Sequence, residues 1–300
     1  MRINRGRVFN QFIKSVPPCA VIESGARLTV ETQDALFGCA EAVRDGRIAH
    51  EECRTRANPA TGPLYIKDAR PGDVLEVRIH EIRLVGKGVL NVPNTGTPTA
   101  HTYNGYEYIE AEALVGGCLR VLASGKAVPA FPMIGVIGTA ADADAGHYAV
   151  EAGDYGGNMD NPAIRAGAVV YLPVFVAGGL LGLGDVHGVM GEGEVFGQGL
   201  EMASEVDITV VLRKDMCIKR PLVETSECLS AAASAETMEQ ASDWAVRDML
   251  DILQDMHGLT PAQAAAAIAF YGDLRVCQVV NAQKTMRMEI RKKYIPLFQS

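Results

Sequence analysis

Short apolar runs alternate with Gly, Pro, Asn and Asp from residue 16 to about 215, and this spacing predicts many short strands. The segment 73–85, DVLEVRIHEIRLV, alternates apolar and polar positions, as expected for a strand with one solvated face. The strand-like runs are 27–32, 62–85, 133–139, 168–176 and 205–213. Many strands with Gly and Pro turns predict a mainly β chain, a β-sandwich or a barrel.

Helical periodicity begins only near residue 235. Within 235–257 an apolar face repeats at a spacing of 3.6 residues and ends before Gly258, a common helix stop. Thr260 and Pro261 then supply an N-cap and a first-turn proline for a second helix, which ends at Gly272. The face of the first helix consists of Ala241, Ala245, Met249, Ile252, Leu253 and Met256.

The pattern predicts one domain over residues 1–300. Its β-rich body extends from about 16 to 230, and the two helices form an insertion at about 235–272 that packs on a sheet. A strand-like run at about 274–280 closes the predicted fold.

Composition narrows the classes of partner. The chain is 48% apolar and 21% charged, an ordinary globular balance, and its net charge of −8 argues against nucleic-acid phosphate as a partner. The apolar run 166–184 contains five glycines and Pro173, which argue against a membrane span.

Seven scattered cysteines without a CxxC pair, and a start without a secretory apolar core, predict a cytoplasmic protein. We expect a small-molecule substrate, no nucleic acid, no membrane, and a homo-oligomer, specifically a dimer.

Acidic and imidazole side chains follow the apolar run in GDVHGVMGEGE. Asp185 and His187 are two residues apart, so in extended backbone both point to the same side. Glu192 and Glu194 repeat this spacing after a glycine. Carboxylate and imidazole suit Zn²⁺, and an oxygen-rich shell would also accept Mn²⁺ or Ca²⁺. An isolated pair such as Asp185 and His187 is more often a hydrogen-bonded turn than a ligand set, although the glycine-rich context favours a metal, and both interpretations stay open from these residues alone.

Further polar residues lie in GGNMDN, where Gly156 and Gly157 permit close backbone approach. Asn158 and Asp160 share a face if this segment is extended, and Asp34 ends the strand-like RLTVETQD.

The sequence lacks the signatures of several other enzyme classes. It has no G-x-S-x-G elbow, no H-E-x-x-H motif and no phosphate-binding loop before a helix. A lone catalytic cysteine stays possible on sequence grounds, but the pattern favours a metal or carboxylate mechanism.

Five long blocks resemble the acetamidase/formamidase family, in the family's order, from about residue 16 to 290. They are NPATGPLYIKDARPGDVLEVRI, FPMIGVIGTA, GGNMDN, LPVFVAGGLLGLGDVHGVMGEGEV and GDLRVCQVVNAQKT. The resemblance implies hydrolysis of a short aliphatic amide, acetamide or formamide, to a carboxylate and ammonia. It also implies a jelly-roll-like β-sandwich built from two related halves, and a divalent ion in some members.

The resemblance also suggests site residues. Two departures stand out: Glu192 occupies a position where the family pattern has Asp, and Tyr155 one where it often has His. Either could alter metal preference or substrate size. The family's acidic and histidine positions correspond here to Asp34, Asp160, Asp185, His187 and Glu194.

These observations lead to the hypothesis of a metal-assisted amidohydrolase. Glu194 is the predicted general base and Glu192 the next candidate, and the ion is Zn²⁺, or alternatively Mn²⁺ or Ca²⁺. The predicted metal ligands are Asp34, Asp160, Asp185 and His187. The predicted contacts to substrate and oxyanion are Gly156, Gly157 and Asn158. The alternatives are a hydrolase of another small C–N substrate, cyclic or carbamoyl, and a non-catalytic sandwich that binds a small molecule.

Overall fold

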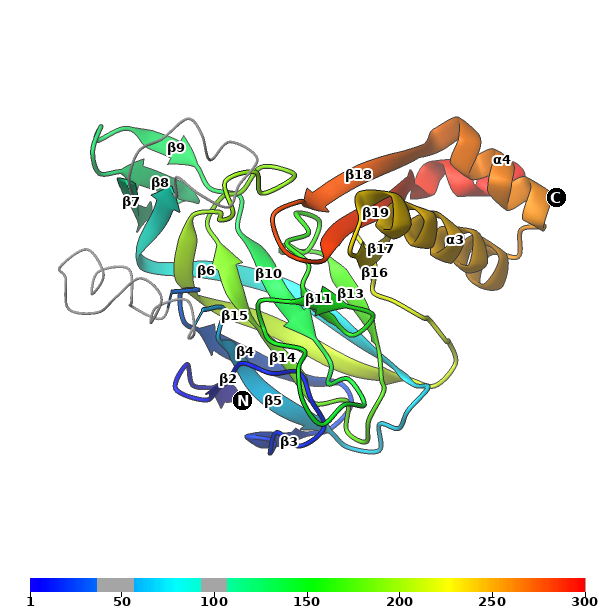
Figure 1. The fold of residues 1–300 in the computed structure, drawn as a ribbon, viewed down its shortest axis with the longest axis horizontal. Coiled ribbons are helices and arrows are strands. Elements are labelled where there is room, and N and C mark those ends of the chain that lie inside the picture. Colours follow the sequence, from blue (N-terminus) through cyan, green and yellow to red (C-terminus); the bar gives the residue numbers. More distant parts are fainter. Residues whose placement is uncertain (37–56, 93–106, 300) are drawn as a thin grey trace.

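The computed structural model describes residues 1–36, 57–92 and 107–299, which form a mainly β structure with C-terminal helices (Figure 1). The predicted class, mainly β with a helical pair on a sheet, is confirmed. The relation of the two halves stays a prediction.

The elements have the following bounds. The first strands are β1 (Arg2–Ile3), β2 (Val8–Phe9), β3 (Ala20–Ile22), β4 (Ala26–Thr32), β5 (Ala60–Ile66), β6 (Val74–Val92), β7 (Glu107–Leu114), β8 (Cys118–Val121) and β9 (Ala127–Pro129). The later strands are β10 (Met133–Gly138), β11 (Ala152–Gly153), β12 (Gly156–Asn158), β13 (Val169–Pro173), β14 (Leu181–His187), β15 (Glu201–Arg213), β16 (Leu222–Glu224), β17 (Cys228–Ala235), β18 (Gly272–Gln278) and β19 (Lys284–Arg291). The helices are α3 (Met238–His257), α4 (Pro261–Tyr271) and the 3-10 helix η2 (Lys292–Phe298).

One layer of the body is organised around β15, which pairs antiparallel with β4 on one side and β6 on the other. Val206 lies opposite both Val30 and Ile82. From Met202 to Val210 every second side chain of β15 is buried, so the period-2 pattern of the sequence places one face of the strand in the core.

A second set of strands is built on β14, which pairs with β5 and β10, while β10 also pairs with β12. The largest core cluster contains residues of both sets, including Leu28 and Ile208 from the first and Ile134 and Leu183 from the second. The two sets join where His187 at the end of β14 pairs with Glu201 at the start of β15. The sheet therefore curls back on itself at this junction.

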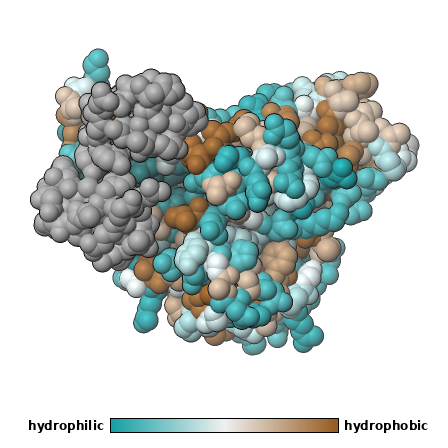
Figure 2. Space-filling view, in the orientation of Figure 1, coloured by the Kyte–Doolittle hydropathy of each residue, from teal (hydrophilic) through white to brown (hydrophobic). Residues whose placement is uncertain are grey.

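The apolar run at 166–184 forms β13, a turn through Gly178 and Gly179, and β14, and β13 lies within the strand predicted at 168–176. Both turn glycines have a positive φ, which favours glycine. Among the residues described, no helix has the length and apolar character needed to cross a membrane. Figure 2 shows a largely hydrophilic face with scattered hydrophobic residues, which is ordinary for a folded surface.

The helical pair begins and ends where the capping residues predict. Thr237 caps α3, Gly258 ends it with φ 68°, and Thr260 forms a capping box with Gln263 at the start of α4. The predicted face of α3 is buried against β17 and β19, with the exception of Met256, which lies in the last turn and is 42% exposed.

The chain after α4 contains one strand more than the sequence analysis predicts. The run at 274–280 forms β18, but β19 follows and lies between β17 and β18. Met286, Met288 and Ile290 of β19 are buried, with Met288 and Ile290 in the same cluster as Met249 of α3. Figure 1 shows the β18–β19 hairpin reaching from the helices back towards β10 and β11.

Candidate active site

Ionisable side chains gather in the interior where β14 meets β15. Ligand atoms of Asp160, Asp185 and His187 all lie within 4.8 Å of one another, and so do those of His187, Glu194 and Glu201. All five side chains are buried, and Glu194, the most accessible, is 6% exposed. Carboxylates and imidazole are thus concentrated in the interior of the protein, with little exposure to bulk solvent.

His187 is central to this cluster. Its Nε2 lies 3.5 Å from Asp185 Oδ1 and 3.3 Å from Glu201 Oε2. These atoms, together with Asp160 Oδ1, are buried and have no hydrogen-bond partner within residues 1–36, 57–92 and 107–299. Buried polar atoms without partners are rare in native proteins, because each costs the free energy of its lost hydration. The set therefore has the character of a ligand sphere.

Three asparagine side chains hold the two aspartates. Asn58 Nδ2 donates to Asp185 Oδ2 at 2.8 Å. In the amide orientation that satisfies its neighbours, Asn158 donates to Asp185 Oδ2 at 2.9 Å and to Asp160 Oδ2 at 3.2 Å, and accepts from Asn281 Nδ2 at 3.0 Å. Each aspartate thus has its Oδ2 fixed by amides, while no described residue forms a hydrogen bond with its Oδ1. Such outer contacts orient the ligands of metal sites.

The backbone also departs from ordinary conformations here. Asn58, Asp160, Asp185 and Glu194 have φ of 55°, 45°, 54° and 47°. A non-glycine residue held at such φ costs of order 1–3 kcal/mol, and such residues cluster at functional sites. Asp185 lies within the continuous strand β14, so the left-handed conformation occurs inside a strand, at the residue that carries the carboxylate.

Gly135 of β10 provides the space for both carboxylates. In the β10–β14 register it faces Asp185, between the pairs Ile134–Val186 and Val136–Gly184. A Cβ at this position would lie 2.5 Å from Asp160 Oδ1 and 2.7 Å from Asp185 Oδ2. Only glycine fits without displacing these oxygens.

The β18–β19 hairpin brings Asn281 to the site, and Gln278 fixes its turn. The buried Gln278 Oε1 accepts from the backbone N–H groups of Val280 at 3.1 Å and Asn281 at 3.0 Å. Its Nε2 donates to Gln283 O at 2.5 Å and to Thr285 Oγ1 at 3.1 Å. The C-terminal part of the chain is therefore built into the cluster.

Burial dominates the electrostatics of the acids. Burial, with the charge of Asp185, raises the pKa of Asp160 to about 7. Burial likewise raises the pKa of Glu201 to about 8, although His187 opposes it. Burial, then the charge of Asp160, raises the pKa of Glu194 well above its usual value. Burial lowers the pKa of His187, but Glu201 and Asp185 outweigh it, and the net shift is upward.

Comparison with known proteins shows the family of this chain. A sequence model of the Acetamidase/Formamidase family matches residues 1–142 and 128–241. The chain belongs to this family. The crystal structure of an acetamidase from Bacillus halodurans is 32% identical, covers 100% of both chains and has a TM-score of 0.89. That of a predicted acetamidase/formamidase from Thermoanaerobacter tengcongensis is 33% identical, covers 99% of this chain and 97% of the other, and has a TM-score of 0.88.

A formamidase from Methylophilus methylotrophus is 42% identical over 78 residues. The match spans 24% of this chain and 19% of that protein.

In this member of the acetamidase/formamidase family, the structure brings together four of the predicted acidic and histidine positions: Asp160, Asp185, His187 and Glu194. Asp34 belongs to neither group of potential ligands, and its Oδ1 accepts from Leu36 N at 3.1 Å. Glu192 is 41% exposed and pairs with Arg287 outside the cluster. Roles for Asp34 and Glu192 stay predictions.

The glycines of GGNMDN lie in β12, between β10 and β11. A Cβ at Gly156 would lie 2.4 Å from Ile137 O, and one at Gly157 would lie 2.4 Å from Glu151 O. The close backbone approach predicted at Gly156 and Gly157 is therefore made to the backbone of neighbouring chain segments. Their contact with an oxyanion stays a prediction.

Sequence reasoning missed Glu201, Asn58 and Asn281. Glu201 is the first residue of β15, and a glutamate at the start of a strand is ordinary. The other buried residues of β15 are mostly apolar, so the strand pattern did not mark Glu201 as buried. Asn58 and Asn281 are far from the cluster in sequence and reach it only through the fold. The signal available for Asn281 is its place in the family-like block GDLRVCQVVNAQKT.

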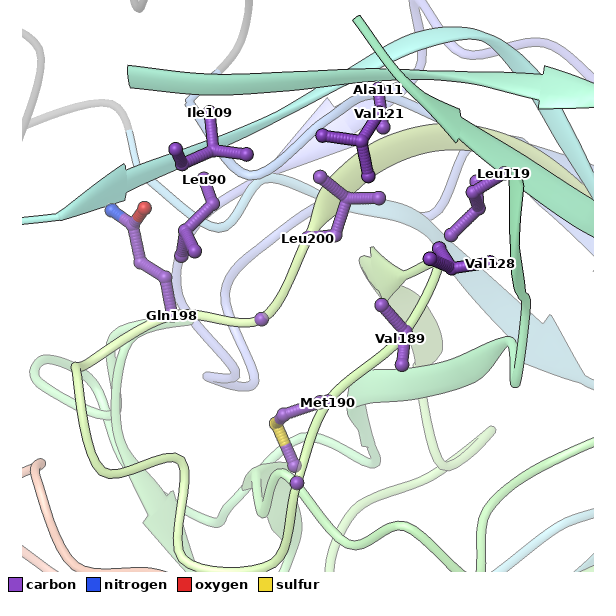
Figure 3. Close-up of a pocket in the computed structure, with 12 residues that line it drawn as sticks. Leu90, Ile109, Ala111, Leu119, Val121, Val128, Val189, Met190, Gln198 and Leu200 are labelled. Carbon is purple, nitrogen blue, oxygen red and sulfur yellow. The ribbon is translucent and has the colours of Figure 1, made fainter. Parts of the chain in front are cut away.

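An apolar cavity of about 280 Å³ lies beside the cluster. Figure 3 shows Leu90, Leu119, Val121 and Leu200 lining one part of it, with Val189 and Met190 opposite. Gly199 also lines the cavity, and a Cβ there would lie 2.6 Å from His187 Cγ. The cavity therefore reaches the segment that packs on the imidazole ring.

Substituting Gly135→Ala should remove the metal-binding capacity of the site. The added methyl group would displace the oxygens of Asp160 and Asp185, and metal sites tolerate little error in ligand position. Gly191→Ala is the matched control, because a Cβ at Gly191 would meet no atom of the described residues within 4 Å. Zinc content and affinity of both variants, measured after dialysis, check this prediction. Equal zinc binding by both variants would contradict it.

The raised pKa values predict how stability depends on pH without metal. The folded protein keeps protons on Asp160 and Glu201 up to about pH 7 and 8, whereas the unfolded chain releases them near about pH 4. With chelator present, the free energy of unfolding should fall as pH rises from about 5 to 8. Denaturant unfolding at several pH values checks this, and Glu201→Gln should flatten the slope. Stability that rises with pH over this range would contradict the assignment.

Proposed function

We propose that this chain hydrolyses short aliphatic amides, such as acetamide or formamide, to a carboxylate and ammonia with the help of a bound divalent cation. The observation that carries this proposal is a buried set of atoms on Asp160, Asp185, His187 and Glu201 that have no hydrogen-bond partner in the part of the chain that the structure describes. The chain also belongs to the acetamidase/formamidase family. The similarity to an acetamidase over the full length of the chain supports the reaction class.

The donor set fits a divalent cation. Asp160 Oδ1, Asp185 Oδ1 and His187 Nε2 would hold it, with Glu201 beside them. Carboxylate and imidazole ligands favour Zn²⁺, with Mn²⁺ or Ca²⁺ as alternatives. Such an ion supplies Lewis acidity, which polarises a carbonyl group and makes water more acidic.

Glu194 is the proposed proton carrier. As the oxygen of water bonds to the amide carbon, the Glu194 carboxylate accepts a proton from that water and returns one to the leaving nitrogen when the C–N bond breaks. Its pKa is raised by burial and by Asp160, which moves the carboxyl towards the range in which acceptance and return are both efficient. Glu192 is paired with Arg287 instead.

The remaining site residues hold this arrangement. Glu201 Oε2 lies 3.3 Å from His187 Nε2 and offers a further carboxylate oxygen to the same cation. We assign Asn158 to positioning of the two aspartates, because both of its amide hydrogens are directed at their Oδ2 atoms. The N–H groups of Gly156 and Gly157 stay our candidates for the oxyanion. A cytoplasmic location and a homodimer stay predictions from the sequence.

Ammonia release from a panel of amides tests the proposed function. Formamide and acetamide should be hydrolysed, and prior treatment with chelator should abolish turnover until Zn²⁺ or Mn²⁺ is restored. Longer amides, cyclic amides and carbamoyl compounds belong in the panel, because the apolar cavity of about 280 Å³ exceeds the size of an acetyl group. Full turnover by metal-free protein would refute the metal mechanism. A ligand-induced thermal shift without any product would instead indicate a binding protein.

Replacing Glu194 by Gln should lower kcat by about 10²–10⁴-fold while metal stays bound, since this is the usual contribution of general acid–base catalysis. Glu192→Gln is the matched comparison and should cause a much smaller loss, because Glu192 lies outside the cluster. Steady-state kinetics with metal analysis check both variants. Loss of metal from the Glu194 variant would identify Glu194 as a ligand and contradict its role as base.

A further inference from the structure

A second cavity of about 280 Å³ lies between the β18–β19 hairpin, the β16–β17 turn and the segment after Asp160. We name it the arginine cavity, because the side chains of Arg165, Arg275, Arg287 and Arg291 line it. Three carboxylates also line it, so positive charge is in excess by one.

Two of the arginines form a repulsive pair. Arg275 of β18 and Arg287 of β19 are direct partners in the antiparallel register, which places both side chains on one face of the hairpin. Like charges in this position destabilise a sheet. Glu192 and Glu289 partly offset the repulsion, but Glu289 meets Arg275 and Arg287 at no less than 3.4 Å, longer than a well-formed charged hydrogen bond.

The other two arginines are available to a ligand. The guanidinium groups of Arg165 and Arg291 make no hydrogen bond or ion pair with any residue that the structure describes. Nε of Arg275 is buried and likewise has no hydrogen-bond partner among them. Guanidinium groups bind carboxylate and phosphate oxygens through paired N–H donors.

The arginine cavity is also linked to the candidate base. Arg287, whose side chain is 5% exposed, pairs with Glu192. Next to it, Gly193 N donates to Cys277 O at 3.0 Å, and Val279 N donates to Gly193 O at 3.1 Å. The segment that carries Glu194 is therefore anchored to the hairpin at this cavity.

We propose that the arginine cavity binds a small oxyanion, a carboxylate or phosphate, and that its occupancy lowers turnover by drawing the arginines away from Glu192. The effect on turnover rests on the amidase function proposed above, whereas the binding does not. A carboxylate would come from the reaction itself, and inorganic phosphate from the surrounding solution.

Thermal unfolding tests the binding, with acetate or inorganic phosphate titrated at constant ionic strength against chloride. At least one of the two should give a saturable stabilisation, and the two titrations distinguish the sources. The double variant Arg165→Gln/Arg291→Gln should weaken this binding by at least about tenfold, because it removes two charged donors. Arg247→Gln, which changes an exposed arginine of α3, is the matched control and should bind as the unmodified protein does.

The variant His187→Ala separates the arginine cavity from the metal cluster, and it should keep the stabilisation. Loss of binding in His187→Ala would overturn the proposed site, and so would undiminished binding by the double variant. The proposed site would also be overturned if neither acetate nor phosphate bound saturably. In the active enzyme the anion should lower kcat by about fivefold or more, the lower end of common coupling between sites. The double variant should lose this effect on kcat, and unchanged kcat at saturating anion would overturn the link to Glu194.

Discussion

Four carboxyl groups and one imidazole share a buried volume, and their mutual electrostatics constrain the rest of the structure. Burial alone penalises each charged form by several kcal/mol even after relaxation, and Asp160, Glu194 and Glu201 respond with raised pKa values. Protons can relieve this repulsion, and so can a divalent cation. The protein therefore places in its interior a charge that a bound cation would neutralise.

The fold supplies the restraints that hold these groups together. The junction of β14 and β15 sets His187 opposite Glu201, and Gly135 leaves room for the carboxylates. Asn281 reaches the site from the turn of the β18–β19 hairpin, which follows the helices in the chain. Gln278 fixes this turn by accepting a hydrogen bond from Asn281 N. The helices are distant from the chemistry, yet α3 packs on β19 and so supports the strand that ends this hairpin.

Local chemistry made part of this predictable from sequence. The caps at Thr237, Thr260 and Gly258 fixed the helices, and the spacing of Asp185 and His187 indicated a shared site. Glu201 could not be found in this way, because its contact with His187 depends on strand register rather than on spacing. The strand β19 was missed because its sequence, KTMRMEIR, alternates only weakly between apolar and polar residues. In the structure both its methionines and an arginine are buried. Asp185 was expected in extended backbone, and its φ of 54° follows from the fold around it.

Anomalous diffraction from crystals of the zinc-loaded protein tests the central claim most directly. We predict one zinc peak bonded to Asp160, Asp185 and His187, at the usual distances of about 2.0–2.2 Å from their oxygen and nitrogen atoms. A fully zinc-exposed crystal with no peak among these side chains, or with zinc only on other residues, would contradict the account.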